Sequence, residues 1–208
     1  MDRLLYFVVL GLIKFLQALP LRWVARIGRG GGAVAYFLDA RHRKVAQRNL
    51  AMCLGRERPP EEIRALAKEN FRRLGENYCC AIKTASMSWE ELKPHLEFTG
   101  VEKAMFGGAG QSPPSMVVGI GHFGNFELYA RFAEHMPVIR CATTYRGLRQ
   151  PSLNRLMQDL RGKTGTTYFE RRTEASALRA WMKPQGCMLG LLADQHAGVG
   201  GVRIPFFG

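Results

Sequence analysis

Two side chains able to perform acid–base chemistry lie close together in residues 119–127, which read GIGHFGNFE. His122 can accept a proton near neutral pH, because the ordinary pKa of imidazole is about 6.5. Glu127 could accept a hydrogen bond from the second ring nitrogen, which would fix the tautomer and stabilise the imidazolium. No serine or cysteine adjoins this pair, so the attacking nucleophile would be a hydroxyl of the substrate. From spacing alone, a structural role for His122 agrees with the sequence at least as well as a catalytic role.

The same segment has glycines at the spacing of a dinucleotide-binding turn, Gly119-x-Gly121-x-x-Gly124. That turn needs a carboxylate about 20 residues further on to hold a ribose. Residues 139–149 (IRCATTYRGLR) supply none, and nucleotide binding leaves the histidine and the glutamate unexplained. We therefore interpret the glycines as places where a substrate can approach the backbone closely.

The elements around this turn alternate between strand-like and helix-like patterns. Such alternation predicts an α/β fold with a mostly parallel sheet covered by helices. His122 would then follow the carboxyl end of a strand, where open α/β sheets bind ligands. The expected strands are residues 116–120, 138–142, 166–169 and 187–193, and the expected helices are residues 125–135, 151–161 and 174–182.

Two more helices are expected before the sheet, followed by a turn-rich connection at residues 101–114. Residues 33–54 read as a helix with a basic face, after a break at residues 28–32 (GRGGG). Pro59-Pro60-Glu61-Glu62 starts the second helix, with proline in its first turn and acids at its positive end. Its apolar residues recur at helical spacing and predict one buried face, formed by Ile63, Leu66, Ala67, Phe71, Leu74, Tyr78 and Ile82.

The first 50 residues hold nine basic and two acidic side chains, and the whole chain has a net charge of +13. Residues 4–13 are almost wholly apolar, Lys14 interrupts them, and FLQALPL follows. We expect a hydrophobic membrane-anchor helix within residues 1–27, which either spans the bilayer or lies on anionic headgroups. A signal peptide and a buried core helix are the alternatives. The expected organisation is an anchor over residues 1–27 and one domain over residues 33–208.

Cysteine usage and motif content bear on the compartment, on metal binding and on nucleic-acid binding. Five cysteines favour a reducing compartment over a disulfide scaffold. Adjacent Cys79 and Cys80 are interpreted as small buried residues, and Asp194-x-His196 offers too few ligands for a metal, so no metal site is expected. The basic charge could attract nucleic acid, but no helix-turn-helix, zinc spacing or aromatic–basic RNA motif is present. No nucleic-acid partner is expected.

Four motifs in order resemble those of the bacterial lipid A biosynthesis acyltransferases, the lauroyl/myristoyl family. His122-Phe-Gly-Asn-Phe-Glu127 is similar to the family's H-x4-E motif, and the other three follow along the rest of the chain. Gly147 and Ala193 stand where the family usually has proline. The other three motifs are Tyr145-Arg146 with Pro151-Ser-Leu-Asn154-Arg155, then Leu160-Arg161-Gly162, then Gly190-Leu-Leu-Ala-Asp194-Gln195 running on to Pro205-Phe-Phe-Gly208.

This resemblance implies a glycerolipid-acyltransferase-like fold. It also implies transfer of a fatty acyl chain from acyl carrier protein, less often coenzyme A, to a hydroxyl of a lipid A precursor. No cofactor beyond that acyl donor is expected. His122 would be the general base and Glu127 its orienting partner, and Arg161 would hold a phosphate or the developing oxyanion. The residues expected to bind substrate are Arg146, Arg161, Asp194 and Asn125.

The resemblance further implies that the chain works on the cytoplasmic face of the bacterial inner membrane. Acidic acyl carrier protein and a phosphorylated glycolipid would both suit its basic surface. Another glycolipid acceptor, such as a phosphatidylinositol mannoside or an ornithine-type lipid, remains open, as does a non-catalytic membrane scaffold. The related glycerolipid enzymes use Asp instead of Glu in the motif, so Glu127 argues modestly against them. Family members continue past PFFG, so we expect a missing C-terminal part and allow for an inactive fragment.

Overall fold

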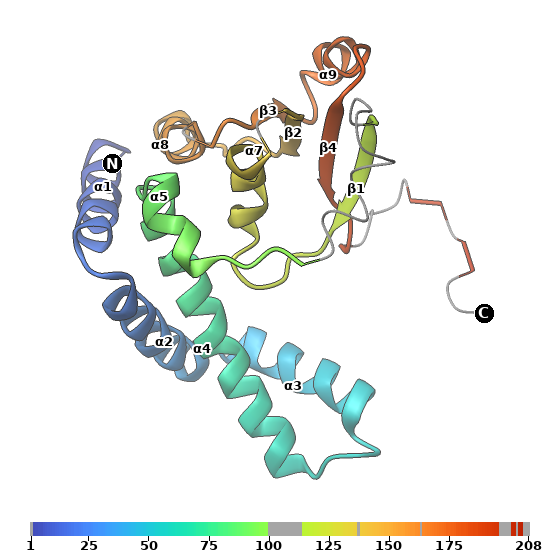
Figure 1. Cartoon of the computed structure of the whole chain (residues 1–208). Coiled ribbons are helices and arrows are strands. Elements are labelled where there is room, and N and C mark those ends of the chain that lie inside the picture. Colours follow the sequence, from blue (N-terminus) through green and yellow to red (C-terminus); the bar gives the residue numbers. More distant parts are fainter. Residues whose placement is uncertain are drawn as a thin grey trace.

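The computed structural model describes residues 2–99, 114–136, 138–162, 164–195, 201–202 and 204–205. It consists of a layer of N-terminal helices beside an α/β body (Figure 1). The N-terminal helices are α1 (Asp2–Ala18), α2 (Leu21–Leu38), α3 (Ala40–Leu54), α4 (Pro60–Thr84) and α5 (Trp89–Leu92), with the 3₁₀ turn η1 (Lys93–His95). The body contains β1 (Met116–Ile120), η2 (Phe126–Arg131), α7 (Phe132–His135), β2 (Arg140–Tyr145), α8 (Pro151–Arg161), β3 (Thr167–Glu170), α9 (Ala175–Met182) and β4 (Cys187–Leu192).

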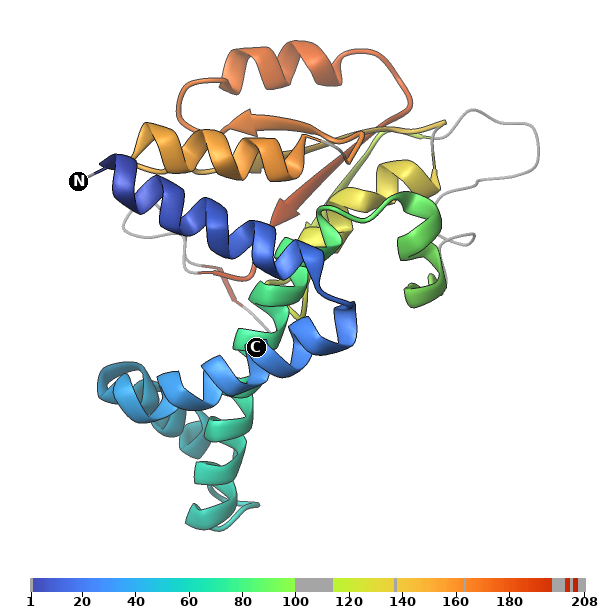
Figure 2. The same ribbon diagram turned by 90° about the vertical axis from the view of Figure 1, so that its left-hand side faces the viewer.

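The described strands form one four-stranded sheet in the order β1-β4-β2-β3, and every described pair is parallel. Side chains alternate between its two faces, as strand geometry requires. Cys141 lies in a core with Phe132 and Met136 on the α7 side, whereas Ala142 packs with Leu178 and Trp181 of α9. Figure 2 shows α9 above the sheet and α7 below it. The expected parallel sheet covered by helices is therefore confirmed for the described residues.

Individual elements differ from their predicted bounds. The strand expected at residues 138–142 is β2, which begins at Arg140 and runs on to Tyr145. The helix expected at residues 125–135 is instead the 3₁₀ helix η2 followed by the single turn α7. A 3₁₀ helix has eclipsed side chains and poorer hydrogen-bond geometry, so it stays short and ends where α7 takes over. The predicted connection at residues 101–114 lies almost wholly outside the described residues.

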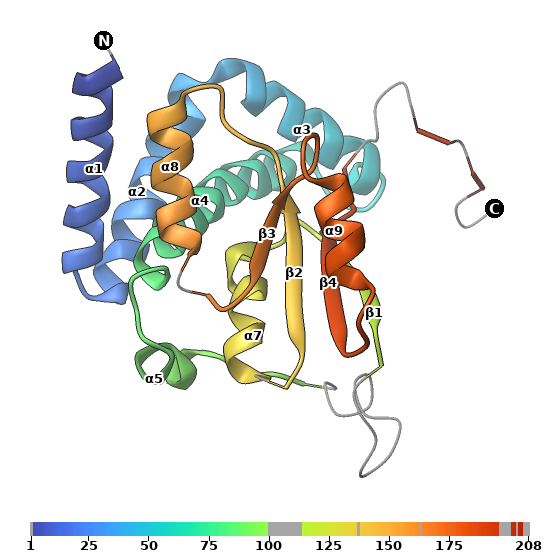
Figure 3. The same cartoon turned by 90° about the horizontal axis from the view of Figure 1, so that it is seen from above.

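The glycine break predicted at residues 28–32 is wrong, because α2 runs through it without interruption. Gly28 and Gly32 serve helix packing instead. A Cβ on Gly28 would lie 2.5 Å from the carbonyl oxygen of Gly75 in α4, and one on Gly32 would lie 2.8 Å from Cα of Arg72. The missing side chains thus let the α2 and α4 backbones cross in direct contact, as Figure 3 shows for the two helices side by side.

Helix α4 begins at Pro60, as the sequence predicted, and its inward face is narrower than the pattern suggested. Ile63, Ala67 and Phe71 are buried, and the ring of Phe71 packs edge-on against Tyr36 of α2. Leu66 and Tyr78 belong to the predicted apolar face but are 41% and 62% exposed. The close glycine crossing limits how much of the α4 surface α2 can cover, so part of the predicted face remains outside.

The expected membrane-anchor helix is α1, which ends at Ala18, and Pro20 is the N-cap of the next helix, α2. Among the described helices, none combines the length and the apolar character that crossing a bilayer requires. Ile13 and Leu16 of α1 are buried, and Lys83 at the end of α4 donates a hydrogen bond to the Gln17 carbonyl at 2.6 Å. One side of α1 is therefore fixed to the fold, while Leu4, Phe7, Val8, Leu12 and Phe15 are exposed.

Candidate active site

His122 and Asp194 meet at one edge of the sheet because their strands are paired in parallel. The register of β1 and β4 places Ile120 opposite Leu192 at the ends of the two strands. The second residue after each strand end is then His122 on one side and Asp194 on the other. The imidazole Nδ1 lies 2.6 Å from Asp194 Oδ1, and the His122 backbone N–H donates to Oδ2 at 2.7 Å. A carboxylate can only accept, so the shared proton sits on Nδ1 and Nε2 is the basic nitrogen.

This double contact also stabilises the charge of Asp194. The side chain of His122 and then its backbone N–H are the main causes that hold the Asp194 pKa below its ordinary value. Gly121, just before the histidine, lies beside the carboxylate, and a Cβ there would be 3.5 Å from Oδ2, an ordinary van der Waals contact. Gly124 turns the chain away after His122 with a φ of +60°, which favours glycine. The Phe126 ring then packs edge-on against the imidazole at 5.1 Å.

Glu127 pairs with Arg161, and its expected contact with His122 is not formed. Arg161 Nε donates to Glu127 Oε2 at 3.0 Å, and a second guanidinium nitrogen donates to Oε1. Glu127 lies in η2 beyond the Gly124 turn and faces the end of α8, whereas Asp194 comes directly off the neighbouring strand. The prediction that Glu127 orients the imidazole is therefore corrected: Asp194 occupies that position.

Arg161 is the last residue of α8 and is largely enclosed. Burial lowers its pKa, but the hydrogen bonds and charge of Glu127 more than compensate, so the pKa is raised overall. Its guanidinium carbon lies 5.6 Å from the ring centre of Tyr168 on β3. Burial raises the pKa of Tyr168 to about 12, so this phenol stays neutral beside the ion pair. The arginine is thus held charged at a partly apolar site.

A cavity of about 640 Å³ is lined by the Glu127–Arg161 pair and by the two neighbours of His122 in the chain. Glu127 and Arg161 contribute to its wall, as do Gly121 and Phe123 on either side of His122. Most of the remaining wall is apolar and comes from the α7-side face of the sheet, from η2 and from the start of α7, with Val118, Ile120, Phe126, Leu128, Phe132, Met188 and Leu192. Such a cavity suits a long apolar group with a polar end near the two pairs.

Of the other predicted site residues, Asn125 belongs to the cavity wall and Arg146 does not. Asn125 precedes η2, and its amide Nδ2 donates to the Thr84 hydroxyl at 3.3 Å. Arg146 follows β2 and is exposed, with the adjacent Tyr145 in the wall. The Asp194-x-His196 pair cannot be placed, because His196 lies outside the described residues. Within the described part of the chain, no three His, Cys, Asp or Glu side chains are grouped to hold a metal ion.

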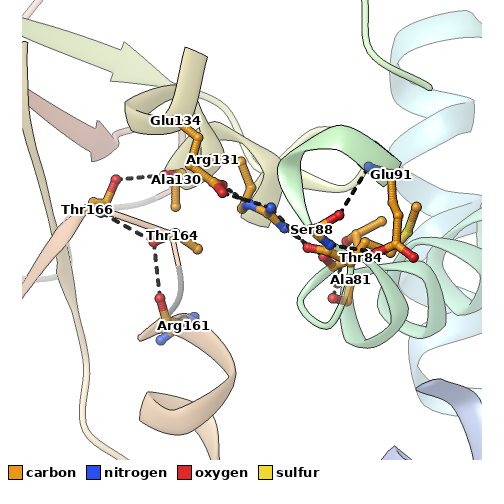
Figure 4. Close-up of polar contacts among 11 residues, drawn as sticks. Ala81, Thr84, Ser88, Glu91, Ala130, Arg131, Glu134, Arg161, Thr164 and Thr166 are labelled. Atoms are coloured by element: carbon orange, nitrogen blue, oxygen red, sulfur yellow. Dashed lines mark hydrogen bonds and ion pairs between the residues drawn. The ribbon is translucent and has the colours of Figure 1, made fainter. Parts of the chain in front are cut away.

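The sequence reading missed a set of buried polar residues behind the site. Thr84, Arg131 and Thr164 are the buried polar or charged residues of the described chain, and they lie between α4, η2 and the end of α8. Figure 4 shows their hydrogen bonds, which reach the backbone of Arg161. The available signal was Arg131 among the mostly apolar residues 128–133 (LYARFA), where an unpaired charge would be costly.

Comparison with known families identifies one matching family. The family model of the bacterial lipid A biosynthesis acyltransferases matches residues 1–208. No curated protein matches the chain. The family match spans the helical layer, the parallel sheet and the residues that build the paired site. The chain therefore belongs to the bacterial lipid A biosynthesis acyltransferase family.

Proposed function

We infer that this acyltransferase moves a fatty acyl chain from the thioester of acyl carrier protein to a hydroxyl of a lipid A precursor. The observation that supports this most is the His122–Asp194 pair at the carboxyl ends of β1 and β4, beside a largely apolar cavity. A paired imidazole can activate a hydroxyl, and the cavity can take an acyl chain. Family membership supplies the reaction class.

In the proposed mechanism, Nε2 of His122 removes the proton from the acceptor hydroxyl. Asp194 holds the Nδ1 proton and stabilises the imidazolium that forms. The resulting alkoxide oxygen attacks the thioester carbonyl carbon, and the carbonyl becomes a tetrahedral oxyanion. The carbon–sulfur bond then breaks, and the imidazolium returns its proton to the departing thiolate. The products are an ester and the free thiol of the carrier, with no net consumption of protons.

Glu127 has a different part in this proposal from the one its motif suggested. Its two oxygens fix the Arg161 guanidinium through a two-point contact, which leaves other N–H groups of Arg161 free to serve the substrate. A fixed cation in a partly apolar wall stabilises a developing oxyanion or a lipid phosphate more strongly than a solvated one. Arg146 is proposed to contact the acceptor. Asn125, in the cavity wall, is proposed to contact the bound acyl chain.

The proposed place of action is the cytoplasmic face of the bacterial inner membrane. The exposed apolar side of α1 carries Leu4, Phe7 and Phe15, and α2 adds Trp23 next to Arg22 and Arg26. A helix with such a face can lie in the headgroup layer, with its cations on anionic lipid. The basic face of α3, with Arg41 and Lys44, is proposed to attract the acidic acyl carrier protein.

The test is an acyl-transfer assay with the chain purified in detergent, acyl carrier protein loaded with defined chains, and a tetra-acylated lipid A precursor. The product should gain the mass of one acyl chain, and His122→Ala should abolish the gain. His42→Ala is the matched control, because His42 has the same two-point contact with Asp39 at an exposed helix start. Equal transfer by the His122→Ala variant would overturn the mechanism. Transfer only to another glycolipid would overturn the proposed acceptor.

A further inference from the structure

We propose that Arg131 is a positioning residue for the Glu127–Arg161 pair, acting through the buried polar cluster Thr84, Arg131 and Thr164. This inference rests on the proposed function, since it assigns the pair a part in acyl transfer. Arg131 is only 3% exposed, it is not among the residues that line the cavity, and its guanidinium donates to Thr84, Met87 and Glu134 and to neither member of the ion pair. Its effect on the site must therefore pass through the backbone segments that it holds.

The first of those segments is the carboxyl end of α4. Arg131 Nη1 donates to the Thr84 carbonyl at 2.7 Å, and Nη2 donates to the Met87 carbonyl at 3.1 Å. The end of a helix has unpaired carbonyls and a partial negative charge, so a cation there is favourable. Glu134 balances the charge by accepting from Nε and from Nη2. One side chain thus fixes the start of the body to the end of the helical layer.

The second segment is η2 itself, because Arg131 is its last residue and Glu127 is near its start. η2 is fixed at two points against α4: by Arg131, and by the Asn125 amide on the Thr84 hydroxyl at 3.3 Å. Both contacts meet at Thr84. A short 3₁₀ helix has few internal bonds, so its orientation depends on these external contacts more than an α-helix would.

The third segment is the connection between α8 and β3, which determines where Arg161 lies. Thr166 Oγ1 donates to the Ala130 carbonyl at 2.6 Å, and Thr164 Oγ1 donates to the Arg161 carbonyl at 3.0 Å (Figure 4). The Thr166 backbone N–H donates to the Thr164 hydroxyl at 3.4 Å. The residue next to Arg131 is therefore linked by hydrogen bonds to the backbone of Arg161. Both halves of the ion pair are supported by the same cluster.

Arginine is required here by geometry as well as by charge. Its planar guanidinium reaches two carbonyls of one segment and a carboxylate of another, whereas a lysine ammonium is a point charge that cannot meet all three in the same directions. Arg131→Met removes one donor from the Thr84 carbonyl, one from the Met87 carbonyl and both donors of Arg131 from Glu134. Because transfer depends on orientation at the ångström scale, we expect kcat to fall by roughly tenfold to a hundredfold, with KM for the acyl donor nearly unchanged. Arg131→Lys should recover only part of that loss.

The experiment compares Arg131→Met and Arg131→Lys with Tyr36→Ala, a control that opens the helical core beside Phe71 and lowers stability away from the cluster. Melting temperatures measure how far each of the three variants is destabilised. Amide hydrogen exchange is then measured in residues 126–131 and 161–166, and kcat and KM in the transfer assay. Faster exchange in both segments and a fall in kcat, for the Arg131 variants alone, would support the inference. Unchanged exchange in residues 161–166 would overturn it, whether or not the chain transfers acyl groups.

A double variant separates positioning from general loss of stability. If Arg131 acts through Glu127, then Arg131→Met added to Glu127→Gln should lower kcat no further than Glu127→Gln alone. A merely structural contribution would multiply the two losses, and that result would overturn the inference. An inactive unaltered chain would refute the proposed function and leave the exchange measurement to decide the inference. The two failures are therefore distinguishable.

Discussion

Replacing Asp194 by asparagine should impair acyl transfer strongly, although the two side chains have the same shape. Both Asp194 oxygens accept from His122, one from the ring Nδ1 at 2.6 Å and one from the backbone N–H at 2.7 Å. An amide has one acceptor oxygen and one donor NH₂ group, so it can satisfy only one of these contacts. Asp194→Asn must therefore either oppose two donors or change the protonation of the imidazole.

The size of the effect depends on which contact asparagine keeps. If its oxygen stays on Nδ1–H, a neutral amide replaces the charged acceptor and stabilises the imidazolium less, so kcat should fall roughly ten- to a hundredfold. If its oxygen keeps the backbone N–H, the amide NH₂ donates to Nδ1 and moves the ring proton to Nε2. The basic nitrogen is then blocked, and the loss approaches about 10⁴-fold, as for a triad held in the wrong tautomer.

The assay is single-turnover transfer of a labelled acyl chain, combined with nitrogen NMR of the imidazole to identify the tautomer. Asp39→Asn is the control, because Asp39 makes the same two contacts with His42 and asparagine is an equally good helix cap. The control should transfer at the rate of the unaltered chain. An Asp194→Asn variant with unchanged kcat and an unchanged tautomer would refute the assignment of Asp194 as the partner of His122.

Three further predictions concern stability and reactivity. Gly32→Ala should lower the melting temperature, because overpacking of the α2–α4 crossing costs about 1–3 kcal/mol. Gly31→Ala, with open space around its Cβ, should instead gain about 1 kcal/mol of helix propensity. Equal effects of the two variants in thermal melts would contradict the packing argument. Because the Asp194 pKa is lowered on folding, its stabilisation is present above pH about 4 and lost as pH falls through the folded value. The difference in melting temperature between the unaltered chain and Asp194→Asn should therefore shrink in acid. A difference that grows in acid would contradict the lowering of the Asp194 pKa on folding. Burial raises the pKa of Cys80 and Cys141 to about 11, so alkylation at pH 8 should modify exposed Cys53 before either of them. Peptide mass spectrometry identifies which cysteine is labelled first. Early labelling of Cys141 would show that the sheet core opens.

The order of the elements was predictable because it depends on local patterns. Proline and acidic residues set the start of α4 at Pro60, and Gly162 ends α8 after Arg161. Short apolar runs identified β1 and β4, and alternation with helices identified the parallel sheet. The boundaries of β2 and the 3₁₀ form of η2 were not predictable, since the sheet register and the contacts with α4 decide them.

The glycines at residues 28–32 show how a local rule can mislead. Glycine in isolation disfavours a helix by about 1 kcal/mol relative to alanine, which made a break the natural prediction. In the folded chain two of these glycines, Gly28 and Gly32, let α2 approach Gly75 of α4 more closely than any side chain would allow. The gain comes from a partner more than 40 positions away, which no local pattern in α2 reveals.

The sequence by itself determined the chemistry available at this site: a histidine after a strand, two carboxylates and an arginine in ordered motifs. Only the tertiary structure decided which carboxylate serves which cation. Glu127 is near His122 along the chain, but the turn at Gly124 directs it to Arg161. Asp194 is 72 positions away and becomes the partner of His122, because parallel pairing of β1 and β4 aligns the two strand ends in register.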